Sequence, residues 1–207
     1  MGIMRRKRTA VLISGRGSNL SALIAAASAP EFPAEIALVL SNREDAAGLA
    51  IAQKAGIATC AISHRNFDSR EAFDRAIDAA LREANIDLVC EAGFMRIHSY
   101  WFPTAWEGKL LNIHPSLLPA FKGTHVQQQA IDAGVKISGC TVHFIVPELD
   151  SGPIIAQAAV PVLPDDTADT LAARILVEEH KLYPAALRLV AEGKVRLEGG
   201  RAVFAAA

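Results

Sequence analysis

Residues 9–40 read TAVLISGRGSNLSALIAAASAPEFPAEIALVL, and this stretch decides the fold. An apolar run at residues 9–13 ends in a glycine-rich turn, a helical stretch follows at residues 19–27, and a second apolar run spans residues 36–40. Short apolar runs separated by a helix are typical of parallel strands that are covered on both faces. The stretch therefore predicts one strand–helix–strand unit of a parallel sheet.

The same alternation continues to about residue 113. We expect helices at residues 44–55 and 69–83, and strands at residues 58–62, 87–90 and 110–113. Because crossovers between parallel strands are right-handed, this order predicts a doubly wound, Rossmann-like sheet with helices on both faces.

The second half has a different pattern. The β runs at residues 136–146 and 153–162 are joined by a segment that is too short for a crossover helix, so we expect an antiparallel pair that extends the sheet. A long helix at residues 167–192 follows, with Pro184 as a kink or a break. The predicted fold class is α/β: a mostly parallel sheet with helices on both faces and an antiparallel pair in the C-terminal half.

Length and composition favour one domain. The chain has 207 residues, of which 51% are hydrophobic, and this is enough for one substantial core. We expect residues 1–8 to form a flexible basic tail before the first strand. Residues 195–207 are expected to form a C-terminal hairpin and tail, with the turn at Gly199-Gly200.

Charge and cysteine content exclude several classes of protein. The net charge is −1 and the sequence pI is about 6.6, so the basic surface typical of nucleic-acid binding is not expected. No apolar run is long enough for a membrane span or a secretory signal. The three cysteines have no CxxC spacing, so neither a disulfide framework nor a zinc site is expected. A cytoplasmic location is the natural expectation.

Three segments directly follow predicted strands, at residues 14–19, 93–97 and 112–119. In doubly wound sheets, ligands bind outside the carboxyl ends of the strands. We therefore expect these segments to share one rim.

The first segment, Ser14-Gly15-Arg16-Gly17-Ser18-Asn19, has two interpretations. Glycines and a following helix N-terminus suit a phosphate group, and the same residues also suit a tight strand-to-helix turn capped by Ser18 or Asn19. The segment lacks the spacing of a P-loop or of a dinucleotide fingerprint, and no acidic residue ends the second strand.

The segment Leu111-Asn112-Ile113-His114-Pro115 places two polar side chains two residues apart on a strand, so both point to the same side. An amide and an imidazole that face one site can stabilise a developing oxyanion, and the imidazole can also move a proton. For Asn-x-His alone, a capped strand end with a hydrogen-bonded histidine is the simpler interpretation.

A third motif, Asp150-Ser151-Gly152-Pro153, occupies the turn between the two late β runs. Such a sequence is ordinary for a turn. The functional alternative makes Asp150 the partner of His114, because a carboxylate can orient an imidazole and keep it charged. Sequence alone leaves both interpretations open.

Together these motifs resemble the formyltransferase family that uses 10-formyltetrahydrofolate. The family pattern is Asn-x-His-x-Ser-x-Leu-Pro with a later Asp-x-Gly-Pro, and residues 112–119 and 150–153 match it. The resemblance is narrowed to the branch that formylates glycinamide ribonucleotide by four further matches, at residues 14–19, 92–97, 179–180 and 183–184. The match extends from about residue 9 to about residue 193. The resemblance implies a single formyltransferase domain and the third step of purine (IMP) biosynthesis.

The resemblance also implies a role for each matching residue. The catalytic trio is Asn112, His114 and Asp150; the ribonucleotide is held by Gly17, Ser18, Asn19 and Glu179; and the folate is held by Arg70, Met95, Arg96, Ile97, Asn112, Glu148 and Leu149. A reduced folate is the co-substrate, and no metal is implied. Two positions depart from the pattern: Pro147 stands where an acidic residue is frequent, and His98 where leucine is common.

Rival functions remain. Formyltetrahydrofolate hydrolase shares the trio but usually carries a regulatory domain, and methionyl-tRNA formyltransferase carries a further C-terminal domain and a basic surface. A nucleotide-binding module without catalysis needs residues 17–19 but not the trio. The sequence leaves open whether the chain is a monomer or a weak homodimer.

Overall fold

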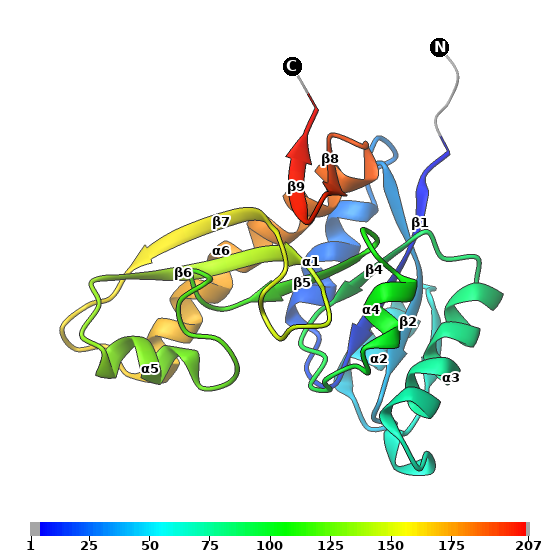
Figure 1. Cartoon of the computed structure of the whole chain (residues 1–207), viewed down its shortest axis with the longest axis horizontal. Coiled ribbons are helices and arrows are strands. Elements are labelled where there is room, and N and C mark those ends of the chain that lie inside the picture. The colour runs from blue at the N-terminus through cyan, green and yellow to red at the C-terminus, as the bar shows by residue number, and fades with distance from the viewer. Residues whose placement is uncertain (1–4, 206–207) are drawn as a thin grey trace.

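A computed structural model describes residues 5–205 of the chain. Its centre is a seven-stranded sheet in the order β3-β2-β1-β4-β5-β6-β7 (Figure 1). The strands are β1 (Lys7–Ile13), β2 (Ala34–Ser41), β3 (Ala58–Ala61), β4 (Leu88–Glu91), β5 (Leu110–His114), β6 (Ile137–Phe144) and β7 (Ile154–Pro161). The first five strands are mutually parallel and the last two pair antiparallel, so the predicted fold class is confirmed.

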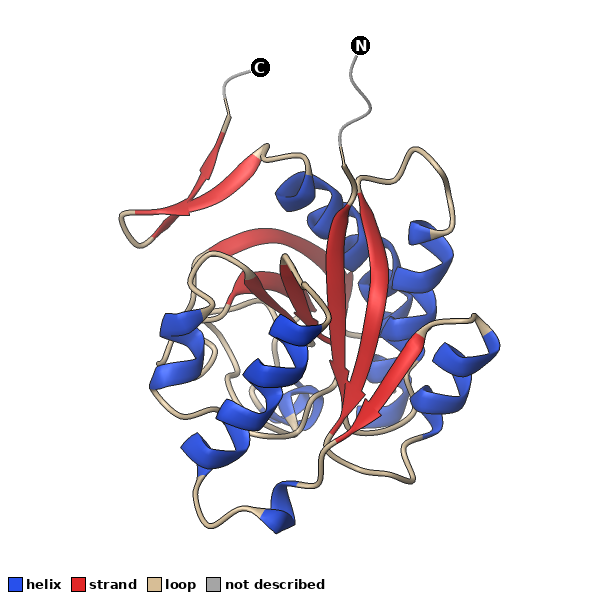
Figure 2. Cartoon of the chain, turned by 90° about the vertical axis from the view of Figure 1, so that its right-hand side faces the viewer, coloured by secondary structure: helices blue, strands red, loops and turns tan. Residues whose placement is uncertain are grey.

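Helices cover both faces of the sheet (Figure 2). They are α1 (Ser18–Ala27), α2 (Ala47–Lys54), α3 (Arg70–Glu83), α4 (Trp101–Ala105), α5 (Val126–Asp132) and α6 (Ala168–Ala191), with a 3-10 turn η1 (His64–Asn66). Strand β1 is buried on both sides: Val11 and Ile13 pack into the core beneath α1 and α6, whereas Ala10 and Leu12 pack beneath α3 and α4. This two-sided burial is why the central strands are continuous apolar runs.

The chain reverses its direction of winding next to β1. From β1 it proceeds to β2 and β3 on one side, and it then returns to place β4 on the other side of β1. The crevice at the carboxyl ends of β1 and β4 is therefore the switch point where such sheets bind ligands.

The C-terminal half extends the sheet and closes one face. Strands β6 and β7 form the expected antiparallel pair, and α6 packs against both of them. Helix α6 runs continuously from Ala168 to Ala191 with Pro184 inside it, so the expected break at that proline is wrong. Strands β8 (Val195–Glu198) and β9 (Arg201–Phe204) form the predicted hairpin, and both glycines of its turn have positive φ angles.

The expected basic tail is wrong for residues 5–8, and residues 1–4 lie outside the described part. Strand β1 begins at Lys7, Arg5 pairs with Asp87 at 2.7 Å, and Arg8 pairs with Glu35 at 2.9 Å. The guanidinium of Arg6 donates to the carbonyl oxygens of Ala27, Phe32 and Ala34. These arginines therefore fasten the start of the sheet.

Three short helical elements, η1, α4 and α5, lie where the sequence suggested no helix. Helix α2 begins at Ala47, three residues later than expected. Among the residues that the structure describes, no helix is both long and apolar enough to cross a membrane.

Candidate active site

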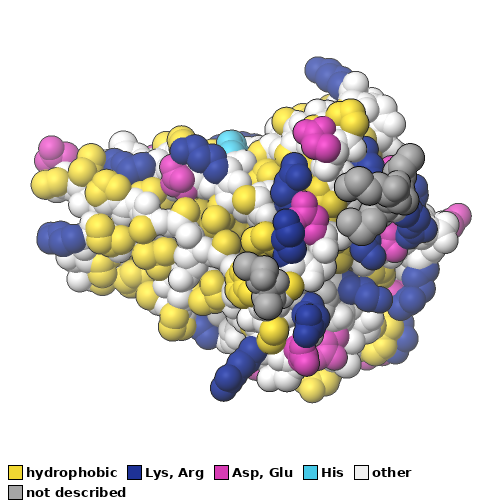
Figure 3. Space-filling model, turned by 90° about the horizontal axis from the view of Figure 1, so that it is seen from above, with side chains coloured by type: hydrophobic (Ala, Val, Ile, Leu, Met, Phe, Trp, Pro, Cys, Tyr) yellow, Lys and Arg dark blue, Asp and Glu magenta, His cyan; other side chains and the backbone are white. Residues whose placement is uncertain are grey.

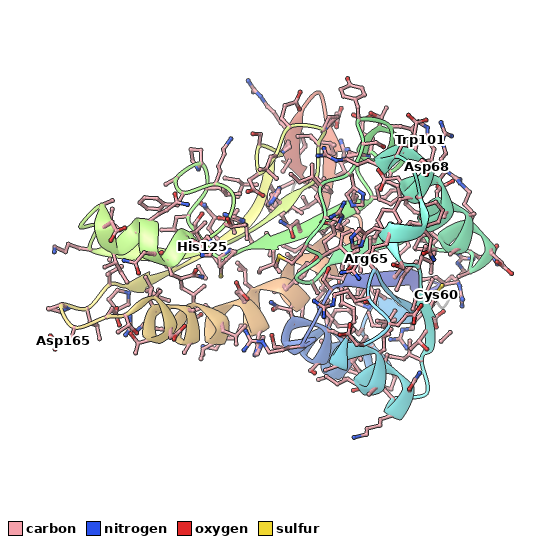
Figure 4. All side chains as sticks on the ribbon, turned by 90° about the horizontal axis from the view of Figure 1, so that it is seen from below. Cys60, Arg65, Asp68, Trp101, His125 and Asp165 are labelled. Carbon is pink, nitrogen blue, oxygen red and sulfur yellow. The ribbon has the colours of Figure 1, made fainter. Side chains whose placement is uncertain are left out.

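A cavity of about 480 Å³ opens at the switch point. Its lining comes from the segments that follow β1, β2 and β4, together with η1. The lining residues are Ser14, Gly15, Arg16, Gly17, Ser18, Asn19, Asn42, Arg43, His64, Ala92, Gly93, Met95 and Arg96. Two of the three segments that were expected to share a rim therefore form one cavity. In Figure 4, seen from below, Arg65 of η1 and His125 before α5 are labelled to either side of the centre.

The start of α1 lines this cavity with features that suit an anion. Gly17 has φ +79°, and a Cβ at that position would lie 2.8 Å from the Cα of Gly48. Only glycine allows this close approach between the turn and α2. The turn exposes the first N–H groups of α1, which have no partners within the helix and carry the positive end of its dipole. The guanidinium-bearing residues Arg16, Arg43 and Arg96 add positive charge.

Asn19 connects the start of α1 to α6. Its Nδ2 donates to Oε2 of Glu179 at 2.8 Å, and both side chains are buried. Burial raises the pKa of Glu179, while the hydrogen bond from Asn19 and the nearby His180 and His114 act in the opposite direction. Glu179 therefore lies within electrostatic reach of both the start of α1 and the imidazole at the end of β5.

Asn112 is held by a histidine on the neighbouring strand. The two residues are register partners between β5 and β6, and Nδ2 of Asn112 lies 3.3 Å from Nε2 of His143. The Nδ1 of His143 donates to the carbonyl oxygen of Phe144 at 2.8 Å, and burial lowers the pKa of His143. The neutral ring therefore has an unprotonated Nε2, which accepts one amide hydrogen of Asn112. The second hydrogen on Nδ2 remains available to another acceptor.

His114 and Asp150 meet although 36 positions separate them in the chain. The Nδ1 of His114 lies 3.6 Å from Oδ1 of Asp150, which is ion-pair distance, and the side chains are 6% and 8% exposed. The Nε2 of His114 donates to the carbonyl oxygen of Phe121 at 2.9 Å. The Oδ2 of Asp150 accepts from the N–H of Gly123 at 2.8 Å, and Asp150 itself has φ +46°. A strained backbone at a buried carboxylate is typical of a functional site.

The loop at residues 92–99 forms the other wall. Met95 and Arg96 line the cavity, and the side chains of Met95 and Ile97 are 70% and 53% exposed. The Nε of Arg96 is buried and has no hydrogen-bond partner among the described residues. The loop therefore offers an apolar surface and a buried donor beside the cavity.

The remaining predicted folate residues lie farther apart. Glu148 and Leu149 are exposed directly before Asp150, and Ser151, directly after it, accepts a hydrogen bond from Lys122 at 2.6 Å. Arg70 is the exposed first residue of α3 and is not among the residues that line the cavity. Within residues 5–205 no group of three or more His, Cys, Asp and Glu side chains is placed to hold a metal ion.

Sequence reasoning missed two contributors. The predicted site does not include His143, which faces Asn112 across the antiparallel pair β5–β6. The predicted site also lacks His64, which lines the cavity and whose Nδ1 lies 3.3 Å from Nδ2 of Asn42. No sequence pattern places η1 at the cavity.

Comparisons with known proteins agree with this arrangement. A model of the formyl transferase family matches residues 7–187. Phosphoribosylglycinamide formyltransferase of Escherichia coli (strain K12) is 45% identical over 187 residues, which are 90% of this chain and 88% of that protein. The trifunctional purine biosynthetic protein adenosine-3 of Bos taurus is 54% identical over 198 residues, which are 95% of this chain. The chain spans 20% of the length of that relative.

The solved structures agree as well. Glycinamide ribonucleotide transformylase 1 from Symbiobacterium toebii superimposes with a TM-score of 0.94 at 47% identity, covering 97% of this chain and 95% of that one. Phosphoribosylglycinamide formyltransferase from Brucella melitensis gives a TM-score of 0.86 at 52% identity, covering 97% of this chain and 100% of that one.

Proposed function

The chain belongs to the formyl transferase family, and from this premise we propose that it moves the formyl group of 10-formyltetrahydrofolate onto the glycyl amine of glycinamide ribonucleotide. This is the third step of de novo purine biosynthesis. The observation that carries the proposal is the approach of Asp150 to His114 at 3.6 Å, with Asn112 two residues before His114 on the same strand, β5. The names of the bacterial relatives and solved structures support the same substrate pair.

The ribonucleotide takes the α1 side of the cavity. Its phosphate is bound by the N–H groups of Gly17, Ser18 and Asn19, at the positive end of the helix. The carboxylate of Glu179, oriented by Asn19, accepts from the ribose hydroxyls. The folate takes the opposite wall, against Met95, Arg96 and Ile97, with Glu148 and Leu149 of the nearby turn and Arg70 of α3 as further contacts.

The reaction begins when the amine nitrogen attacks the formyl carbon. A new C–N bond forms, the carbonyl π electrons move to oxygen, and a tetrahedral carbon with an oxyanion results. The second hydrogen on Nδ2 of Asn112 and a protonated His114 stabilise this charge. The intermediate then collapses, the bond from carbon to N10 of the folate breaks, and the proton lost by the amine is delivered to N10.

Asp150 is the carboxylate partner of His114. Its carboxylate is fixed by the N–H of Gly123 and stands at ion-pair distance from the imidazole. An anion in this position orients the imidazole, and it also accepts the proton of the attacking amine directly or through a water molecule.

The alternative function, hydrolysis of formyltetrahydrofolate, uses the same trio with water in place of the amine. The names of the relatives and of the solved structures give it no support. An absorbance assay of folate deformylation, run with and without glycinamide ribonucleotide, separates the two reactions. Turnover that requires the amine supports the proposal, whereas equal turnover without it contradicts the proposal.

A further inference from the structure

His98 lies between two buried carboxylates, outside the trio. Its Nδ1 is 2.7 Å from Oδ1 of Asp74 on α3, and its Nε2 is 2.5 Å from Oε1 of Glu91 on β4. The three side chains are 6%, 1% and 8% exposed. The second oxygen of Asp74 accepts from the N–H of Ser99 at 2.6 Å, so Asp74 acts as an acceptor on both oxygens. We call these three side chains, His98, Asp74 and Glu91, the His98 cluster.

The charge state of the cluster follows from its surroundings. Burial by itself lowers the pKa of His98, but Glu91 and Asp74 together overcome this effect and raise the pKa to about 9. The ring also stacks between aromatic side chains, with centroids 4.3 Å from Phe102 and 5.5 Å from Phe94. A cation held by two carboxylates and two aromatic faces has a well-defined position.

This cluster anchors the C-terminal end of the loop at residues 92–99, against which the folate is proposed to bind. At the beginning of the loop, the N–H of Ser14 donates to the carbonyl oxygen of Gly93 at 3.2 Å, and Oγ of Ser14 accepts from the N–H of Met95 at 2.8 Å. At its end, the His98 cluster and the bond from Ser99 tie the loop to α3 and β4. Residues 95–97 lie between the two fixed ends.

The cluster also connects the loop to the catalytic strand. Glu91 and Asn112 are register partners in the parallel pair β4–β5, so their side chains leave the same face of the sheet. The carboxylate that binds His98 therefore belongs to the position directly beside the catalytic amide. Trp101, which is labelled in Figure 4, is the first residue of α4. The guanidinium of Arg75 on α3 lies 3.6 Å from the centroid of the Trp101 ring, and this contact holds α3 and α4 together.

We propose that His98 is a positioning residue for the folate: shared by Asp74 and Glu91, it fixes the loop that carries Met95, Arg96 and Ile97 at a set distance from Asn112. This inference rests on the proposed function, because it assumes that the folate binds against this loop. It assigns a role to a side chain that touches neither substrate.

The direct test compares three single variants. His98→Leu removes the shared cation, and Glu91→Gln keeps the shape of the cluster but removes one of its charges. Asp78→Asn is the matched control, because Asp78 is one turn further along α3 and binds Trp106 and Arg82 rather than the loop. For each variant we would measure kcat, both KM values, and the Kd of 5,8-dideazafolate, a folate analogue, by titration calorimetry.

We expect His98→Leu and Glu91→Gln to raise the Kd of the analogue and the KM of the folate about tenfold, as the loss of one charged hydrogen bond does. The KM of the ribonucleotide should stay within about twofold, and Asp78→Asn should change neither constant. If His98→Leu does not fold, Glu91→Gln carries the test. An equal rise in the KM values of both substrates, or an unchanged KM of the folate and Kd of the analogue, overturns the proposal.

A spectroscopic readout is independent of transfer activity. Nitrogen NMR of the histidine rings should show hydrogen on both ring nitrogens of His98 at pH 7.5, and Glu91→Gln should lower the pH at which the ring loses a proton. A neutral His98 ring at pH 7.5 overturns the proposal. If the wild-type protein does not bind the analogue at all, the proposed function fails instead, and the NMR result still stands.

Discussion

The ring of His143 determines which way the amide of Asn112 faces. Because Nδ1 of His143 donates to the carbonyl oxygen of Phe144, its Nε2 can only accept, and the NH₂ group of Asn112 has to face it at 3.3 Å. The antiparallel pairing of β5 with β6 creates this contact. A residue outside the proposed catalytic trio therefore sets the geometry of one of its members.

His143→Ala should lower kcat on the order of tenfold with little change in either KM, because the loss of one orienting hydrogen bond corresponds to about 1.4 kcal/mol. His143→Gln restores an acceptor near the position of Nε2 and should recover most of the rate. Steady-state kinetics of both variants, with thermal unfolding as a check on folding, decides the matter. An unchanged kcat in His143→Ala would show that Asn112 does not need this partner.

Asp150→Asn should lower turnover about 100-fold or more while leaving the fold intact. Asparagine tolerates the φ of +46° and can still accept from the N–H of Gly123, so the turn is preserved. It cannot supply the negative charge beside His114. Pre-steady-state transfer rates measure the loss, and circular dichroism checks the fold; wild-type rates in this variant would remove Asp150 from the mechanism.

Gly17→Ala should destabilise the protein by about 1–3 kcal/mol, because alanine is strained at φ +79° and its Cβ would lie 2.8 Å from the Cα of Gly48. Gly15→Ala is the matched control for stability, since a Cβ there meets nothing within 4 Å. Denaturant unfolding compares the two variants. If both are equally stable, the tight approach of the turn to α2 is not required.

The His98 cluster predicts a pH-dependent stability with a definite sign. The folded pKa of His98 is raised from 6.5 to about 9, so its contribution is complete below pH 6.5 and is lost as the pH rises through about 9. The reference is the double variant His98→Leu/Glu91→Leu, which lacks the titrating pair. The free energy of unfolding of the wild type, relative to this variant, should fall by on the order of 3 kcal/mol between pH 6.5 and 10. A constant difference would contradict the assigned protonation.

Much of the fold could be predicted because the decisive signals are local. Short apolar runs and an amphipathic helix at Arg70–Glu83 follow directly from hydrophobic periodicity, and the segment of residues 147–152 is too short for a crossover. Pro184 was misleading because tertiary packing of α6 outweighs the loss of one helical hydrogen bond. The basic N-terminal residues were misleading because their carboxylate and carbonyl partners lie more than 20 positions away.

The sequence predicts the parts of the site that lie within one motif. It does not predict the contacts that form only when distant segments fold together. The alternation of a strand places Asn112 and His114 on one side, but their partners His143, Asp150 and Phe121 come from other segments. Exposed hydrophobic side chains were not predicted by any motif: Ile137 of β6 and Phe204 of β9 are each 55% exposed. Figure 3, seen from above, shows hydrophobic side chains gathered on the left part of the surface.

The central claim is that the amide of Asn112 stabilises the oxyanion formed during transfer to the amine. The most direct measurement is a single-turnover transfer of labelled formyl from the folate to glycinamide ribonucleotide by the wild type and by Asn112→Ala. The account predicts a rate about 100- to 1,000-fold lower in a variant with an unchanged circular dichroism spectrum. A correctly folded Asn112→Ala protein that transfers the label at a near-normal rate would contradict it.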